Sequence, residues 1–582
     1  METRVADSQK WRLRCALAFA SQLALLAVLI LTGRLVYNAN DDTTMLAMAC
    51  GGYGEPSEYV IFLHLILGYL LKFLFTICNG VNWLTVLFVV ADMFGVLVLD
   101  MVFASAKRDK AGFLCTVIVL DVALLIVLAH FTFTVVAYWT GIAALTGITY
   151  AFMEQADRRH RIMTGICAGI SLVFCLMIRA KVIQSLVIVY AAYIAVSLLF
   201  KRDWKPLIIA LAAVCLMLVS IKSNVWMNSL NPIQRTYWAW NNARSAVVDY
   251  PSVPYDEEVF SERGITYNQY MAIYNLFFYD YETVSTEVLE NLAELNPVQN
   301  RCDFDVIGML ENHFSLWGST EQRQSFTSLY RILFAAVLLF YLVFGNRKDY
   351  PFLFLIWGSS VAAECVFYFI GRAVYRVVMP GYLLAVILMI LYCSIDPQKE
   401  RKLLSLGISF HKLVVTLTAL LACGGVSSYV LHGDYQAWLY SDTQRAVLEY
   451  MAENDDKVFL AGNGGVGGVE LSASIWNHPG NRGHLNLTGG WAAYSVPYIQ
   501  LMESKGIQDP YNLLYEAIDN DKVLLLTTAG DDYPKYYSWI LGLIEENYHI
   551  KAELEKVEEI SSTDTGSTSV TYSVYKLVTQ TE

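Results

Sequence analysis

Long apolar runs fill most of the first 430 residues of this chain and constrain its fold more than any other feature. A helix needs roughly 20 consecutive apolar residues to cross a bilayer, and several runs reach that length. Charged residues make up only 16% of the chain, against about 25% in soluble domains. The first run, 13–36, is span-length and lacks the small-residue cleavage site of a signal peptide. We therefore expect a polytopic α-helical protein of the cell membrane.

The distribution of Lys and Arg predicts the orientation of these runs. Lys10, Arg12 and Arg14 precede the first run, which places the N-terminus in the cytoplasm under the positive-inside rule. If residues 59–77 form a helix along the outer interface instead of a span, every later basic segment is also cytoplasmic. This arrangement predicts about eleven spans, with the N-terminus inside and the C-terminus outside. They are 13–36, 83–105, 112–131, 133–153, 161–178, 183–200, 206–223, 327–345, 350–370, 374–394 and 409–430.

Two regions follow from this topology. Residues 1–430 form the transmembrane domain, including a first external loop at 38–82 and a large external loop at 224–325. Residues 431–582 form a small extracytoplasmic α/β domain, because helical and alternating patterns follow one another there. We expect helices at 441–451, 496–504 and 539–547, and strands at 457–461, 522–527, 550–558 and 569–578. The acidic excess behind the net charge of −12 belongs to this domain, and the rest of the chain is near neutral, which argues against a nucleic-acid partner.

Two adjacent acids, Asp41 and Asp42, stand in the first external loop, a few residues past the first span. Neighbouring carboxylates near a bilayer are costly unless they have a role. One such acid suits a general base that takes the proton from an acceptor hydroxyl. The structural alternative is that Asp41 or Asp42 caps a short helix. The helical pattern after the acids ends in Gly51, Gly52, Gly54 and Pro56.

This order of features resembles the first external loop of the GT-C class of membrane glycosyltransferases. An acidic pair, a short helix, a glycine-rich turn with proline and an interfacial helix precede the second span. Protein O-mannosyltransferases, the lipid A aminoarabinose transferase and mycobacterial arabinosyltransferases have such a loop. The resemblance implies a GT-C-like fold, a polyprenyl-phosphate sugar as donor and one acid of the pair as the catalytic residue. The mannosyltransferases have Asp-Glu where this chain has Asp41-Asp42, which leaves open which acid acts.

Four basic residues at the outer ends of predicted spans depart from the positive-inside trend. Arg179 and Lys181 lie in a short external turn, and Arg372 and Arg376 begin the tenth span. Four residues apart on a helix, the last two would share a face. Arg binds a phosphate through two parallel hydrogen bonds, so these cations suit the leaving phosphate of the donor. The alternative is that they reach lipid headgroups.

Further residues of the external loops are candidates for substrate contact. His64, Glu55 and Glu58 belong to the first loop. Tyr237, Trp238 and Arg244 open the large loop, where aromatic rings suit either sugar stacking or anchoring of a helix in the interface. No zinc or metalloprotease motif is present, so the sequence identifies no certain cofactor and leaves a divalent cation as an option.

The sequence therefore predicts an integral membrane glycosyltransferase that acts on an extracytoplasmic glycan, lipid or protein. Asp92, Asp100, Asp121 and Glu364 lie within predicted spans, where acids are functional candidates by default. A transporter or lipid flippase is thus the main alternative, although we expect most of these acids to pair within the helix bundle. The third alternative is a non-catalytic protein of envelope assembly. The segment Gly462–Gly467 fits a dinucleotide motif but lacks the acid that should follow about 20 residues on, so we interpret it as a plain loop.

Overall fold

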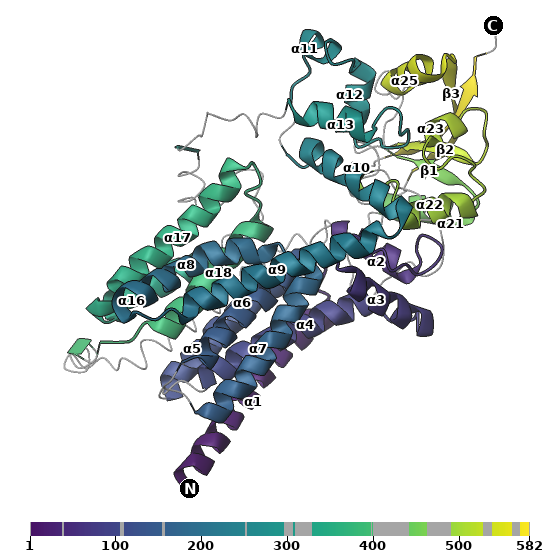
Figure 1. Ribbon diagram of the computed structural model, residues 1–582. Helices are drawn as coiled ribbons and strands as arrows, with labels where there is room; N and C mark the ends of the chain where they lie inside the picture. Colours follow the sequence, from purple (N-terminus) through teal and green to yellow (C-terminus); the bar gives the residue numbers. More distant parts are fainter. Residues whose placement is uncertain are drawn as a thin grey trace. The chain divides into compact units, whose positions relative to one another are not determined.

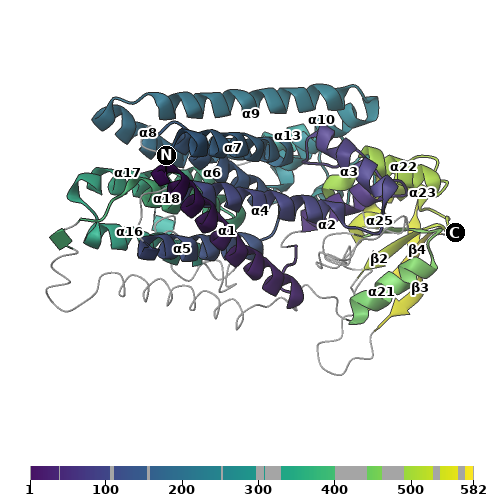
Figure 2. The same cartoon turned by 90° about the horizontal axis from the view of Figure 1, so that it is seen from below.

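The computed structural model divides the chain into two compact units (Figures 1 and 2). Unit 1 comprises Met1–Asn38, Thr85–Ser223 and Phe304–Tyr435, and unit 2 comprises Ala39–Leu84, Asn224–Asp303 and Gln436–Glu582. The predicted domain boundary near residue 430 falls outside the described residues. Those are 2–37, 40–104, 110–153, 157–250, 253–295, 307–308, 329–396, 398–399, 442–461, 490–527, 538–561 and 571–580.

Unit 1 is built from long apolar helices. Nine helices of the described residues are long and apolar enough to cross a membrane, which agrees with a polytopic membrane protein. A further apolar helix, α16 (Leu329–Phe344), has 16 residues and matches the predicted span 327–345. The predicted span 409–430 lies outside the described residues, so the count of eleven stays a prediction. The long helices are α1 (Glu2–Leu31), α4 (Trp83–Ala104), α5 (Lys110–Ala129), α6 (Phe133–Ala151), α7 (Arg158–Arg179), α8 (Val182–Lys201), α9 (Lys205–Ser229), α17 (Tyr350–Phe369) and α18 (Tyr375–Tyr392).

Acids inside the bundle of unit 1 are mostly paired, as expected. Glu364 accepts hydrogen bonds from Arg331 at 2.8 Å and from the Tyr382 hydroxyl at 2.5 Å. Gln22 donates to Asp100 at 3.0 Å, and Ser21 donates to Asp121 at 2.6 Å. Asp92 differs from these, because neither of its side-chain oxygens has a hydrogen-bond partner among the described residues.

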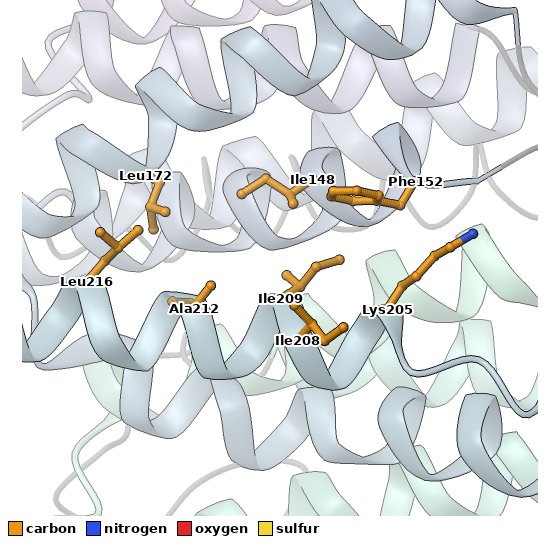
Figure 3. A pocket seen from close by; sticks show the side chains of 9 residues that line it. Ile148, Phe152, Leu172, Lys205, Ile208, Ile209, Ala212 and Leu216 are labelled. Carbon is orange, nitrogen blue, oxygen red and sulfur yellow. The ribbon is translucent and has the colours of Figure 1, made fainter.

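An apolar groove of about 220 Å³ lies between α6, α7 and α9 (Figure 3). Ile148, Leu172 and Leu216 are among its lining residues, and Lys205 at one end is the only charged one. A groove with so few polar groups has no means of orienting a sugar or activating a hydroxyl. We therefore do not place the predicted sugar transfer in this groove.

Unit 2 contains a four-stranded mixed sheet in the order β1-β2-β4-β3. β1 (Val458–Leu460) is parallel to β2 (Val523–Thr527), and β4 (Tyr572–Thr579) is antiparallel to both β2 and β3 (Ala552–Ile560). The strands and the helices α21 (Asp442–Glu453), α22 (Val496–Ser504) and α25 (Ser538–Tyr548) agree with the predicted segments to within a few residues. The small sheet domain near the C-terminus is thus confirmed.

Both faces of the central strand β2 are buried, whereas the edge strand β3 is mostly exposed. Val523 and Leu525 of β2 face the larger core, which also includes residues of α10 (Pro232–Val248), α12 (Tyr267–Tyr274) and α13 (Thr286–Ala293). Leu524 and Leu526 face a smaller core with Val447 of α21. A strand that is covered on both faces has a continuous apolar sequence, which explains the run Leu-Leu-Leu in β2. The larger core also contains Met48 and other residues of the first loop.

The first loop forms two helices, α2 (Asn40–Cys50) and α3 (Leu65–Ile77). The 13 residues of α3 are too few for a span, which agrees with the prediction that this segment does not cross the membrane. The helix starts at Leu65, however, and not at the predicted residue 59. The reason is a cap at His64, whose side chain accepts from the Ile66 backbone N–H. Gly68 of α3 lies so close to the loop that a Cβ atom there would stand 1.9 Å from the Glu58 carbonyl oxygen. Whether α3 lies along the membrane interface stays a prediction.

Candidate functional site

Asp41 and Asp42 both lie in the first turn of α2. Neither is the N-cap, because the helix begins at Asn40. Carboxylates are favoured at this end of a helix by the exposed N–H groups and the helix dipole. Consecutive helical residues point about 100° apart, so the two side chains meet different surroundings. Asp42 is 0% exposed, whereas Asp41 is only half-buried, so Asp41 is the more accessible acid of the pair.

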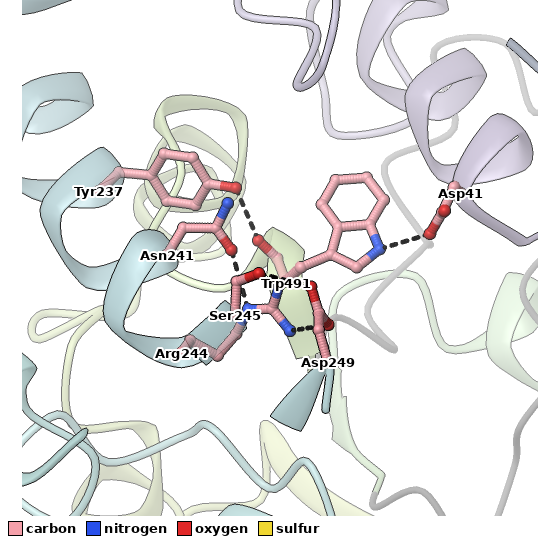
Figure 4. A network of polar contacts seen from close by, with 7 residues as sticks. All are labelled: Asp41, Tyr237, Asn241, Arg244, Ser245, Asp249 and Trp491. Atoms are coloured by element: carbon pink, nitrogen blue, oxygen red, sulfur yellow. Dashed lines mark hydrogen bonds and ion pairs between the residues drawn. The ribbon is translucent and has the colours of Figure 1, made fainter. Parts of the chain in front are cut away.

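Asp41 is held by a tryptophan 450 positions further along the chain. The Trp491 indole N–H donates to Asp41 Oδ1 at 3.0 Å (Figure 4). Trp491 belongs to the short 3-10 helix η4 (Gly490–Ala492), and its carbonyl oxygen accepts from the Tyr237 hydroxyl at 2.8 Å. The Phe62 ring packs against the indole with the ring centroids 4.9 Å apart. Residues of the first loop and the large loop therefore both contact Trp491 of the C-terminal segment.

The glycine-rich turn after α2 has the backbone conformations that its sequence suggests. Gly51 and Gly54 have φ angles of +93° and +106°, which other residues rarely adopt. The Ser57 N–H then donates to the Met48 carbonyl at 3.0 Å, which brings the chain back against α2. This turn fixes where α2 ends and so contributes to the position of the acid pair.

Two of the other first-loop candidates, Glu58 and His64, make contacts that stabilise α3. Glu58 forms an ion pair with Lys72 of α3 at 2.6 Å, and His64 caps that helix through Nδ1. Burial lowers the pKa of His64, which favours the neutral ring that this acceptor role requires. Glu55 is exposed. A contact between any of the three and a substrate stays a prediction.

The α10 candidates are divided by burial. Tyr237 and Arg244 are 1% and 4% exposed, so both belong to the interior of unit 2, whereas Trp238 is half-buried. Arg244 donates to Asn241 at 2.8 Å and pairs with Asp249 at 3.3 Å (Figure 4). Their burial indicates that Tyr237 and Arg244 support the structure rather than contact a sugar directly. Tyr237 supports Trp491 through its hydroxyl, whereas Arg244 pairs with Asp249.

The four predicted phosphate ligands belong to unit 1. Arg179 donates to Thr134 and lies over the Phe133 ring at 4.9 Å, while Lys181 is exposed. The expectation that Arg372 and Arg376 share one helix face is wrong, because α18 begins at Tyr375 and Arg372 precedes it. Both arginines are half-buried. Their part in phosphate binding stays a prediction.

The described residues include no ready-made metal site. Within the described parts of the chain, no three His, Cys, Asp or Glu side chains gather in one place. A divalent cation at Asp41 and Asp42 would therefore have to complete its coordination with oxygens of the substrate or with water. The Gly462–Gly467 loop falls outside the described residues.

Comparison with known proteins identifies no relative of this chain. No protein-family model, no curated protein and no solved structure matches it.

Proposed function

We propose that this chain is an integral membrane glycosyltransferase of the GT-C type. It transfers a sugar from a polyprenyl-phosphate donor to an extracytoplasmic glycan, lipid or protein acceptor, and Asp41 is the general base. One observation carries the proposal: a half-buried carboxylate at the start of α2 is held in place by Trp491, while its neighbour Asp42 is fully buried. A carboxylate held in this way suits removal of a proton from a hydroxyl.

In the proposed reaction the acceptor oxygen attacks C1 of the donor sugar. Asp41 takes the proton of the acceptor hydroxyl, the bond from C1 to the phosphate oxygen breaks, and polyprenyl phosphate leaves with the electron pair. A carboxylate has about four lone-pair positions, and the Trp491 N–H uses one of them. Phosphate is a stable leaving group, so the enzyme has to supply position, a base and neutralisation of charge.

Arg372 and Arg376 are the proposed partners of the leaving phosphate, with Arg179 and Lys181 as the alternatives. This assignment depends on the predicted topology, which puts all four at the outer ends of their helices. Arg179 already donates to Thr134 and lies over the Phe133 ring, so binding a phosphate would require it to exchange these contacts. Arg372 lies in the turn before α18, and Arg376 lies in the first turn of that helix.

The test uses purified protein in lipid nanodiscs and a panel of synthetic polyprenyl phosphates carrying mannose, glucose, galactose or arabinose. We expect one member to release polyprenyl phosphate in the presence of envelope extract as the source of acceptor. Asp41→Asn should lower that release by about 10²–10⁴-fold, because it removes one positioned base. The variant should still bind the donor, as measured by equilibrium binding. Normal turnover by Asp41→Asn, or no release from any donor, would contradict the proposal.

A further inference from the structure

We infer that Trp491 is a positioning residue for Asp41, so that the C-terminal segment completes the site of the first loop. The inference rests on the proposed function of Asp41 and adds the role of the C-terminal domain in it. Its basis is the hydrogen bond of 3.0 Å between the Trp491 indole N–H and Asp41 Oδ1. No other acid of the first loop receives a tryptophan N–H among the described hydrogen bonds.

Trp491 is itself fixed from several sides. Its carbonyl accepts from Tyr237 at 2.8 Å, and Tyr237 is almost fully buried in α10. The preceding residue, Gly490, has a φ of +80°, and its N–H donates to the Leu276 carbonyl at 3.3 Å. Phe62 packs on the ring and has a φ of +76°, which is rare for a residue with a side chain. Such backbone strain persists only where the surroundings hold it, and it is frequent at functional sites.

The chemistry of an indole suits this task. Its N–H is a donor only and does not titrate in the physiological range. It therefore stabilises and orients a carboxylate without giving it a proton, whereas a lysine or a protonated histidine would also neutralise its charge. Hydrogen bonds to charged groups are worth roughly twice those between neutral groups, so loss of this one should be measurable.

Three variants separate positioning from general structural support. Trp491→Phe removes the N–H and keeps an aromatic ring. Trp491→His keeps an N–H, because imidazole Nε2 occupies the place of indole Nε1 when the five-membered rings are superimposed. Trp240→Phe is the matched control, since it removes an indole N–H that donates to the Val284 carbonyl at 2.9 Å in the interior of unit 2. Trp240 does not contact Asp41 in any described hydrogen bond.

Two measurements are made on all three full-length variants in nanodiscs. The first is hydrogen–deuterium exchange of the α2 backbone, which needs no substrate. Trp491→Phe should speed exchange in α2 severalfold, Trp491→His should restore it, and Trp240→Phe should leave it unchanged. The second is release of polyprenyl phosphate from the donor that the wild type uses. Trp491→Phe should lower kcat by about 10–100-fold with donor affinity within about twofold, and Trp491→His at pH 8 should recover most of that loss.

The outcomes have distinct meanings. Unchanged exchange in α2 together with unchanged kcat in Trp491→Phe overturns the inference. An equal effect of Trp240→Phe, or no recovery with Trp491→His, also overturns it, because a merely structural role is then sufficient. If Asp41→Asn turns over normally, the proposed function fails, and the exchange data still decide whether Trp491 holds the start of α2. If Asp41→Asn is inactive and Trp491→Phe is normal, only the inference about Trp491 fails.

Discussion

The ion pair between Arg331 and Glu364 offers a test that distinguishes structural acids in the membrane bundle from transport sites. Arg331 Nη2 lies 2.8 Å from Glu364 Oε1, and the two side chains are 10% and 1% exposed. Removing one partner of such a buried pair leaves an uncompensated charge, which costs about 3–5 kcal/mol. Glu364→Gln keeps the shape and the acceptor for Tyr382 but leaves the charge of Arg331 unpaired. We expect Glu364→Gln to lower the free energy of unfolding by about 3 kcal/mol.

The double variant Arg331→Met with Glu364→Gln removes both charges. Replacing a buried ion pair by neutral groups is often neutral for stability, so the double variant should recover most of the loss. The assay is unfolding by sodium dodecyl sulfate in mixed micelles, followed by circular dichroism. Arg263→Met is the control, because its ion pair with Glu294 is exposed and worth below about 1 kcal/mol.

Additive losses in the double variant would refute the reasoning, because they would show that the two charges do not depend on each other. If Glu364→Gln instead abolished movement of a substrate across the membrane while stability stayed unchanged, the result would support the transporter alternative.

Three further predictions concern the first loop and the phosphate site. Burial lowers the pKa of His64, so the unfolded state binds more protons than the folded state and stability should fall as the pH falls through about 6.5. In His64→Asn the side chain still caps the helix but does not titrate, so this fall should disappear. Thermal unfolding at pH 5 and pH 8 measures the difference. Gly68→Ala should cost about 1–3 kcal/mol in the same assay, because its Cβ meets the Glu58 carbonyl, whereas Gly80→Ala meets nothing within 4 Å and should cost far less. Arg372→Lys should reduce donor affinity nearly as much as Arg372→Ala if the phosphate is bound bidentately, and free substitution by Lys in binding assays would indicate headgroup contact instead.

Periodicity in the sequence predicted the regular elements well. The strands β1 to β4 and the helices α21, α22 and α25 agree with their predicted positions because each has an apolar pattern of its own. Residues 59–64 were expected to be helical because they are apolar, but the His64 cap delays the helix to Leu65. Arg372 was expected on a helix for a similar reason, although α18 begins only at Tyr375. Boundaries depend on single caps and turns, which an apolar pattern does not reveal.

The site was predictable only in part. The acid pair stood out because adjacent carboxylates are unusual beside a span. Its link to Trp491 was not predictable, because the two residues are 450 positions apart and nothing in the spacing connects them. Aromatic residues of α10 fitted both a sugar surface and an interface anchor, and only burial showed that Tyr237 supports Trp491 from the interior. Contacts between distant segments depend on tertiary packing, which composition and periodicity do not specify.

The central claim is that Asp41 faces the reacting sugar of a lipid-linked donor. A cryo-electron microscopy map of the protein in nanodiscs with a non-transferable polyprenyl-phosphonate sugar tests it most directly. We predict density for the sugar within one sugar ring of the Asp41 carboxylate, and for the phosphonate against Arg372 and Arg376 or against Arg179 and Lys181. Lipid density that lies away from Asp41, with the sugar next to other residues, would contradict the assignment of this base.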